Sequence, residues 1–274
     1  MSARLRGIAQ ETEKIVAAGR YRAPGGHEVL LAAQIRAARA GTRLHGPDPL
    51  ETPQASPVRT RIEVTGESSL EAARRLTAAE APVAVLNFSS ARNPGGGYLN
   101  GAQAQEEALC RASALYTCVR EARAFYDHHR THRDPFYTDR VIHSPAVPVF
   151  RDDRGTLLDE PYTAGFLTSA APNASVVRRT APERAGELPR ALAARAERVL
   201  ETAAAHGYRR LVLGAWGCGV FGNDPTQVAT AFRTLLKDGG RFEGTFEHVA
   251  FGVLDRTRGA VVRTCFERAL GPRL

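Results

Sequence analysis

From residue 58 onward, short apolar runs typical of buried strands alternate with longer segments of helical periodicity. The expected strands cover residues 58–64, 83–88, 141–150, 166–170, 211–213 and 248–254. The expected helices cover residues 68–79, 104–121, 183–206, 224–237 and 260–270. Alternation of this kind favours a mixed or largely parallel sheet that is covered by helices on both faces. We therefore expect an α/β fold with three layers.

The first part of the chain has a different pattern. A short helix is expected over residues 4–17, an extended segment with a turn at Pro24-Gly25-Gly26 over 21–32, and a second helix over 30–40. A polar, proline-rich passage from Gly46 to Pro57 follows and is the best candidate boundary. We expect residues 1–57 to form an accessory segment packed on a single globular domain of residues 58–274.

Composition limits the class of protein. The chain is 43% hydrophobic and 24% charged, which is ordinary for a soluble globular protein. No apolar run approaches membrane-spanning length, and the first residues lack the apolar core of an export signal. We expect a cytoplasmic protein without a membrane partner. The cysteines have no C-x-x-C spacing, so we expect reduced thiols, no metal site and no cofactor.

The charge balance indicates a polyanionic partner without identifying it. The formal net charge is +8, and almost all of the 37 basic residues are arginines, which bind phosphate groups bidentately. These arginines are scattered and are not interleaved with aromatic residues, which argues against a dedicated nucleic-acid-binding module.

The segment Asn87–Arg111, NFSSARNPGGGYLNGAQAQEEALCR, carries the strongest functional signal. An apolar strand leads into a polar loop with three successive glycines, and Gln105-Glu106-Glu107 then opens a helix. Glycines let backbone N–H groups approach a ligand, and a helix start favours anions. The two carboxyl groups add proton-transfer chemistry. The alternative is an ordinary strand-to-helix loop whose glutamates complement the helix dipole.

A second glycine-rich segment, GAWGCGVFGNDP over residues 214–225, also follows an expected strand. Gly217, Gly219 and Gly222 can adopt positive φ and present backbone amides to an anion. Because both loops follow the carboxyl ends of strands, we expect both to lie at the ligand-binding edge of the sheet. Cys218 is not favoured as a nucleophile, because no nearby histidine or aspartate would activate it. His143, inside an apolar strand, is interpreted as a structural histidine whose hydrogen bonds are satisfied.

The two motifs together resemble a known family. Three glycines, seven residues and then Gln-Glu-Glu resemble the signature of poly(ADP-ribose) glycohydrolases, in particular the short bacterial type. The second segment resembles the diphosphate-binding loop of the same family, and the resemblance runs from about Ile8 to the C-terminus. It implies a three-layer α/β/α macrodomain-like sandwich with a mixed central sheet and an N-terminal helical accessory segment. It also implies hydrolysis of ribose–ribose bonds in poly(ADP-ribose).

The resemblance assigns roles to individual residues. Glu107 matches the catalytic glutamate and Glu106 the ribose-binding one; on a helix their side chains point about 100° apart. A protonated Glu107 would act as general acid and then as general base, with its pKa raised by desolvation and by the bound diphosphate. The residues expected to bind substrate are Asn87, Asn93, Gly95, Gly96, Gly97, Gln105, Gly217, Cys218, Gly219, Val220, Phe221, Gly222 and Asn223. Phe221 is alternatively a core residue, and Asn223 alternatively stabilises only its turn.

Three functions remain open at this stage. The first is a monomeric exo-type poly(ADP-ribose) glycohydrolase of the DNA damage response that releases ADP-ribose from poly(ADP-ribosyl)ated proteins. The second is a macrodomain reader that binds ADP-ribose without cutting it. The third is a hydrolase of mono-ADP-ribosyl groups. A reader has no use for the paired Glu106 and Glu107, so the pair favours an enzyme.

Overall fold

The computed structural model describes residues 2–53, 56–78 and 81–271. Its main element is a seven-stranded sheet with the order β3-β6-β7-β5-β8-β9-β4. The strands are β3 (Arg43–His45), β4 (Arg61–Thr65), β5 (Val83–Phe88), β6 (Val141–Arg151), β7 (Leu157–Ser169), β8 (Arg210–Gly214) and β9 (His248–Gly252). β6 pairs antiparallel with β3 on one side and with β7 on the other, whereas the pairs from β7 to β4 are parallel. The expected mixed sheet is confirmed.

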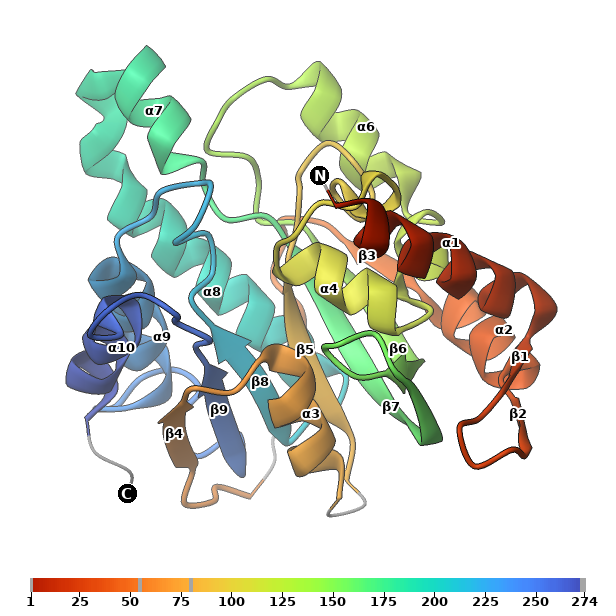
Figure 1. The fold of residues 1–274 in the computed structure, drawn as a ribbon. Coiled ribbons are helices and arrows are strands. Elements are labelled where there is room, and N and C mark those ends of the chain that lie inside the picture. Colours follow the sequence, from red (N-terminus) through yellow and green to blue (C-terminus); the bar gives the residue numbers. More distant parts are fainter. Residues whose placement is uncertain (1, 54–55, 79–80, 272–274) are drawn as a thin grey trace.

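Both faces of the sheet are buried, which explains why its central strands are continuously apolar. In β5, Val83 and Val85 belong to one hydrophobic core, and Ala84 and Leu86 belong to the other. The first core includes residues of α1 (Ala3–Ala18), α2 (Ala32–Gly41), α3 (Ser69–Thr77), α4 (Gln105–Ala112), α5 (Leu115–Val119) and α6 (Arg123–Thr131). The second includes residues of α8 (Leu188–Ala205), α9 (Pro225–Leu236) and α10 (Val261–Leu270). Figure 1 shows α3 and α4 in front of the strands and α8 behind them, and the expected three-layer fold is confirmed.

Local sequence signals fix several helix starts. Ser68 and Glu71 form the expected capping box before α3, in which each side chain bonds the backbone N–H of the other residue. Asp224 caps α9, and Pro225 occupies its first turn, as expected. α3 ends at Thr77, and the expected end of this helix at residue 79 lies outside the described residues.

Three expected elements need correction, and two helices were not expected. The helix expected over 104–121 is interrupted at Ser113, which is extended and forms a bridge to Val149 of β6, so that α4 and α5 are separate. The helix expected over 183–206 begins with the 3₁₀ turn η2 (Pro182–Glu187) and continues as α8. β7 begins at Leu157 rather than at residue 166. α6 and α7 (Ala174–Thr180) occupy segments for which no helix was expected.

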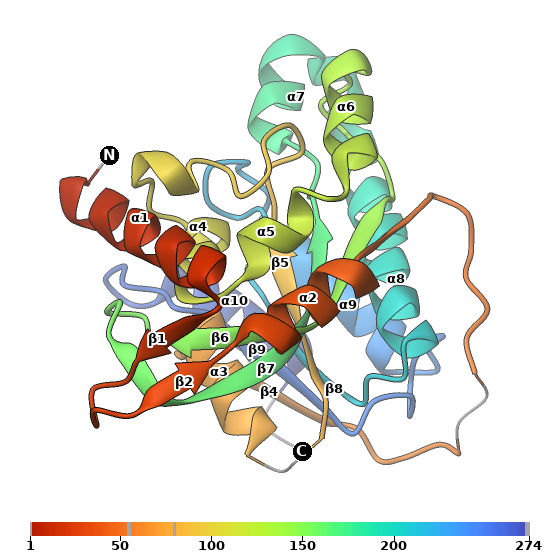
Figure 2. The same ribbon diagram turned by 90° about the vertical axis from the view of Figure 1, so that its right-hand side faces the viewer.

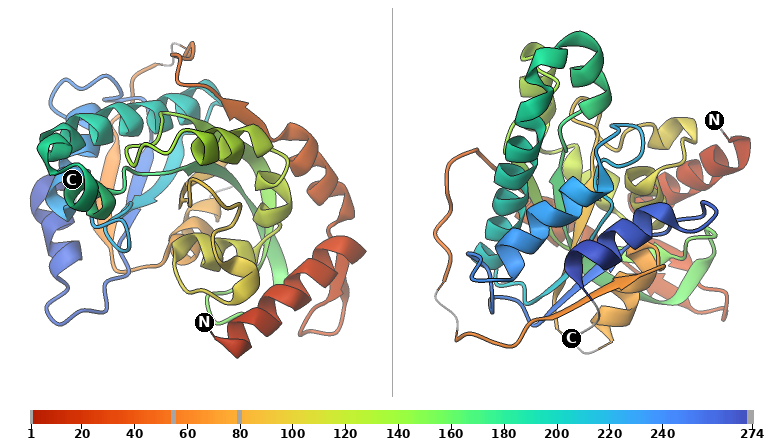
Figure 3. Two further views of the ribbon diagram at one scale, coloured as in Figure 1. Left: turned by 90° about the horizontal axis from the view of Figure 1, so that it is seen from above. Right: turned by 90° about the vertical axis from the view of Figure 1, so that its left-hand side faces the viewer.

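The described part of the segment 1–57 contributes a strand to the main sheet as well as packing on it. The hairpin of β1 (Arg20–Arg22) and β2 (Glu28–Leu30) lies between α1 and α2, as the views in Figures 2 and 3 show. β3 then pairs with residues 141–143 of β6 and forms one edge of the sheet. Beyond these residues β6 pairs with β7 and makes only the isolated bridge from Val149 to Ser113 on its other side, so among the described residues no second ladder needs the missing N–H groups of Pro145 and Pro148.

Two further expectations concern the whole chain. Among the described helices, none combines the length and apolarity that crossing a bilayer requires. Cys110, Cys118, Cys218 and Cys265 are free thiols, as expected for this spacing.

Candidate active site

The two glycine-rich loops lie side by side because they follow neighbouring parallel strands. β5 pairs with β8 on one side and with β7 on the other, and all three point the same way. At the end of β7, the carbonyl of Ser169 accepts hydrogen bonds from Ser89 N–H at 3.3 Å and from the indole N–H of Trp216 at 3.1 Å. One carbonyl therefore ties the start of the first loop to the start of the second, at the carboxyl edge where α/β sheets bind ligands.

The triple-glycine loop needs its glycines for two separate reasons. Gly95 and Gly96 have φ of +66° and +57°, a left-handed conformation that costs other residues free energy. At Gly96 a Cβ atom would also lie 2.5 Å from Glu107 Oε1 and 3.0 Å from Glu106 Oε2. The loop therefore covers both carboxyl groups at a distance that only glycine allows.

Backbone donors of the loop hold the two glutamates. Gly97 N–H donates to Glu107 Oε1 at 2.9 Å, and Ser90 N–H donates to Glu106 Oε2 at 2.7 Å. Both side chains are buried, and neither Glu106 Oε1 nor Glu107 Oε2 has a hydrogen-bond partner among the described residues. Each carboxyl group is thus fixed through one oxygen, while its other oxygen is buried and has no donor among the described residues.

Burial gives the site a carboxyl group that stays protonated at neutral pH. Desolvation, with a smaller contribution from the neighbouring charge of Glu107, raises the pKa of Glu106 to about 8. The hydrogen bond from Ser90 N–H opposes this rise. Adjacent carboxyl groups titrate as a coupled pair. The expected effect of a bound diphosphate concerns Glu107 in the complex and stays a prediction, whereas burial raises the pKa of Glu106 in the free protein.

Gln105 does not have a free amide for a ligand. Its Oε1 accepts from Phe88 N–H at 2.9 Å, and its Nε2 donates to Leu86 O at 2.8 Å and to Ser69 Oγ at 3.0 Å. The side chain thus holds the start of α4 against the end of β5. This arrangement points to a positioning role.

The two asparagines of the first motif lie in different environments. Asn87 is fully buried, and its Nδ2 donates to Thr168 Oγ1 at 3.1 Å while its Oδ1 has no partner among the described residues. Asn93 is exposed on the loop, where its backbone carbonyl accepts from Gly96 N–H at 2.9 Å.

The second loop is closed by Asn223. The backbone N–H and the Nδ2 group of Asn223 both donate to Gly217 O, at 3.0 and 3.2 Å. Gly217 and Gly222 have φ of +70° and +65°, and the expectation of positive φ at Gly219 is wrong. A Cβ atom at Gly219 would meet nothing within 4 Å. The observed contacts of Asn223 agree with the turn-stabilising alternative.

The side chains of the second loop differ in exposure. Val220 is 87% exposed beside the exposed Gly219, whereas Phe221 is half-buried and its ring centroid lies 5.9 Å from that of Tyr137. Burial raises the pKa of Cys218 to about 12, so its thiol is protonated at neutral pH. This agrees with the expectation that Cys218 is not a nucleophile.

Two supporting residues were not anticipated. Ser90 holds Glu106 through its N–H group, and its Oγ accepts from the N–H groups of Arg92 and Asn93, which shapes the loop. Arg111 is buried and donates to Ala102 O at 2.7 Å, which fixes the segment before α4. Arg111 lies four residues after Glu107, a helix spacing that brings opposite charges together and could have been noticed in the sequence.

Fold and site together define a macrodomain-like α/β enzyme with paired carboxyl groups, a glycosidase-type hydrolase. A family model described as the microbial-type PARG catalytic domain matches residues 9–152. The chain is 50% identical to poly(ADP-ribose) glycohydrolase from Thermomonospora curvata, with a TM-score of 0.92 over 98% of this chain and 100% of that one. Against the Deinococcus radiodurans glycohydrolase solved with ADP-ribose, identity is 44% and the TM-score 0.80, over 88% of this chain and 98% of that one.

A third solved structure is the Thermomonospora curvata enzyme bound to the inhibitor ADP-HPD, at 50% identity and a TM-score of 0.89, over 97% of this chain and 99% of that one. A comparison with curated proteins gives no match. The chain belongs to the microbial-type poly(ADP-ribose) glycohydrolase family. The family resemblance, the expected activity and the enzyme class are confirmed.

Proposed function

We propose that the enzyme is an exo-type glycohydrolase that releases ADP-ribose from chain ends, with Glu107 as general acid and base. The observation that carries this proposal is the pair of buried glutamates under the triple-glycine loop. Each carboxyl group is held by one backbone donor and keeps one oxygen without a partner among the described residues. Such a fixed pair suits proton transfer to a leaving group.

The substrate is a terminal ADP-ribose unit, bound across both loops. Its diphosphate faces the amides of residues 217–222, where a backbone free of side chains at Gly217 and Gly219 permits close approach. Phe221 lies over the ribose, and Asn87 and Glu106 bind its hydroxyl groups. The related enzymes solved with ADP-ribose and with ADP-HPD support a ligand of this chemistry.

The reaction balances with the protein's own groups and one water molecule. Glu107 gives its proton to the leaving ribose oxygen as the bond from that oxygen to the anomeric carbon breaks. The substrate diphosphate stabilises the positive charge that develops on the sugar. Water then attacks the anomeric carbon and returns a proton to Glu107. Glu106 keeps a proton at neutral pH, so the pair carries only one negative charge after Glu107 has given its proton to the leaving group, and Glu106 can donate to a substrate oxygen.

The remaining parts of the chain support this site. We propose that residues 1–57 serve as the accessory segment of a catalytic domain of residues 58–274. The enzyme is proposed to act as a monomer on poly(ADP-ribosyl)ated proteins. Gln105, Ser90 and Arg111 are positioning residues, because their contacts are to the protein and they fix the loop and the start of α4.

The deciding experiment compares hydrolysis with binding. Wild type should convert labelled poly(ADP-ribose) to ADP-ribose, and thin-layer chromatography identifies the products. Glu107→Gln should lower the rate at least about a hundredfold, the range for loss of a general acid, because the amide cannot donate the proton. Its affinity for ADP-ribose should stay within a few-fold by calorimetry. A near-wild-type rate in this variant would remove Glu107 from the mechanism, and oligomeric early products would contradict exo cleavage.

A further inference from the structure

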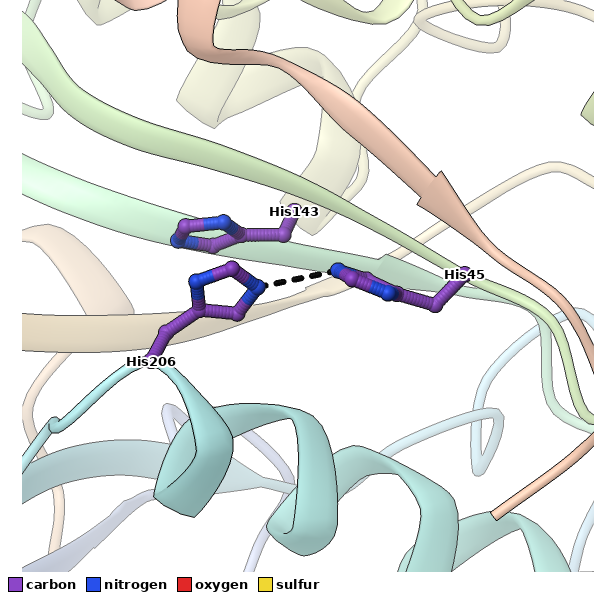
Figure 4. A group of neighbouring side chains, drawn as sticks. All are labelled: His45, His143 and His206. Carbon is purple, nitrogen blue, oxygen red and sulfur yellow. Dashed lines mark hydrogen bonds between the residues drawn. The ribbon is translucent and has the colours of Figure 1, made fainter. Parts of the chain in front are cut away.

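Three histidines that are far apart in the sequence meet at one point of the fold. His45 ends β3, His143 lies in β6, and His206 follows the last turn of α8 (Figure 4). One ring nitrogen from each residue can be chosen so that all three lie within 4.8 Å of one another. Neutral imidazole is a common ligand of zinc and of related transition metals.

The contacts inside this cluster are close and incomplete. His45 Nε2 and His206 Nε2 lie 2.9 Å apart, and the rings of His143 and His206 stack with centroids at 3.7 Å. His143 is 4% exposed, and its Nδ1 atom has no hydrogen-bond partner among the described residues. A buried polar atom without a partner costs free energy, and a ligand bound to this nitrogen would remove that cost.

The other nitrogen of His143 is already fixed. His143 Nε2 lies 2.9 Å from the hydroxyl of Tyr208. If this nitrogen carries the ring proton, Nδ1 has its lone pair available. Metal-binding histidines commonly use their second nitrogen in this way, which sets the tautomer and the ring orientation.

We infer that His45, His143 and His206 form a binding site for one divalent transition-metal ion, and that this ion is Zn²⁺. Zinc–nitrogen bonds of about 2.0–2.1 Å place tetrahedral ligand atoms about 3.4 Å apart, which lies between the 2.9 Å contact and the 4.8 Å limit. Because the lone pair of an imidazole nitrogen lies in the ring plane, the stacked rings of His143 and His206 must turn relative to each other before both can bind the same ion. His206 is exposed, so water can complete the coordination.

This site is separate from the glutamate pair. Val141 and Leu167, which border His143 in the sheet, belong to the core under α8, whereas α4 packs on the opposite face. A bound ion would connect the edge strand β3 to the end of α8. It would thereby anchor the start of the connection that crosses from β3 to β4 at the opposite edge of the sheet.

The test uses the full chain without a histidine tag, stripped with a chelator and then titrated with Zn²⁺ by calorimetry. We expect one ion per chain, an increase in Tm with Zn²⁺, and with Co²⁺ the visible absorption of a tetrahedral or five-coordinate ion. His206→Ala and His45→Ala, at more accessible positions, should each lower the affinity at least about tenfold, since even second-shell changes cost about that much. His143→Gln should do the same, and circular dichroism would show whether it folds.

The matched control is His132→Ala. His128 and His132 stack at 4.0 Å on and after α6 and are the competing histidine pair on the surface. This variant should bind Zn²⁺ like wild type. The inference is overturned if wild type binds no ion at 100 µM Zn²⁺, roughly the weak end for a useful site. It is equally overturned if His206→Ala and His45→Ala keep full affinity, or if only His132→Ala loses it.

Discussion

The backbone of Gly96 lies directly against the carboxyl group of Glu107, so that a Cβ atom at Gly96 would be 2.5 Å from Glu107 Oε1. The same carboxyl group accepts a hydrogen bond from Gly97 N–H at 2.9 Å. The loop therefore positions the proposed catalytic group through contact on one side and a donor on the other. This relationship explains why glycines and glutamates form one motif although eight residues separate them.

Gly96→Ala should lower the hydrolysis rate at least about tenfold, because the methyl group displaces Glu107 and misplacement by about 1 Å can cost a hundredfold. The left-handed backbone at φ +57° adds a strain of about 1–3 kcal/mol. The rate is measured on labelled polymer, and the fold is checked by thermal unfolding. Gly239→Ala is the matched control, since Gly239 lies outside both glycine-rich loops and also has a left-handed backbone (φ +81°), but a Cβ there meets nothing within 4 Å. Equal rates in the two variants would contradict this role of Gly96.

The sequence predicts the parts of the site that depend on local pattern. The strand expected at 83–88 has the same bounds as β5, because an apolar run there leads into a polar loop. The start of α4 at Gln105 was expected at residue 104, and the capping box of Ser68 and Glu71 was expected from its spacing. Each of these features is decided by neighbours in the chain.

Other features depend on contacts between distant segments and leave no local pattern. The break at Ser113 arises from its bridge to Val149. The raised pKa of Glu106 arises from burial under the loop, which helical geometry alone does not show. Both ring nitrogens of His143 were expected to have hydrogen-bond partners, but among the described residues only one does. His143 lies near His45 and His206 because the strand order places β3 beside β6, which no local pattern shows.

The pKa of Glu106 predicts how stability depends on pH. The folded-state pKa of about 8 lies above the ordinary value of 4.5, so the native state binds the proton more tightly than the unfolded state. The stabilising effect of this proton is complete below pH 4.5 and is lost as pH rises through 8. Glu106→Gln should therefore gain stability relative to wild type between pH 5 and pH 9, by a few kcal/mol at order of magnitude. Urea unfolding at both pH values measures this. A difference that does not change with pH would show that Glu106 titrates alike in both states.

Removal of metal should affect the proposed histidine site and leave the active site unchanged. The proposed mechanism uses the charge of the substrate and the two glutamates, so exhaustive chelation should leave the hydrolysis rate unchanged. Chelation should lower Tm, because an ion that binds only the native state stabilises it. Both quantities are measured on the same tag-free preparation. A rate that falls on chelation and returns with Mg²⁺ or Zn²⁺ would contradict the metal-free mechanism.

The last prediction concerns the unit at which hydrolysis stops. The glutamates are held rigidly under the triple-glycine loop, with Gly97 and Ser90 each donating to one carboxyl group. A proton donor fixed in this way suits the hydroxyl of a ribose leaving group. The final ADP-ribose unit is attached to a protein side chain, which is a different leaving group and brings bulky protein surface to the pocket. We therefore expect protein-bound mono-ADP-ribose to persist after the polymer is gone.

Incubation of an auto-modified polymerase with the enzyme tests this expectation. Polymer and protein-bound single units are followed in the same samples, with Glu107→Gln as the inactive control. Polymer should disappear at least about a hundredfold faster than the last unit, since a poorly placed leaving group loses most of the benefit of general acid catalysis. If the last unit leaves as fast as the polymer, the enzyme is a hydrolase of mono-ADP-ribosyl groups as well, and the pocket must admit the protein side chain.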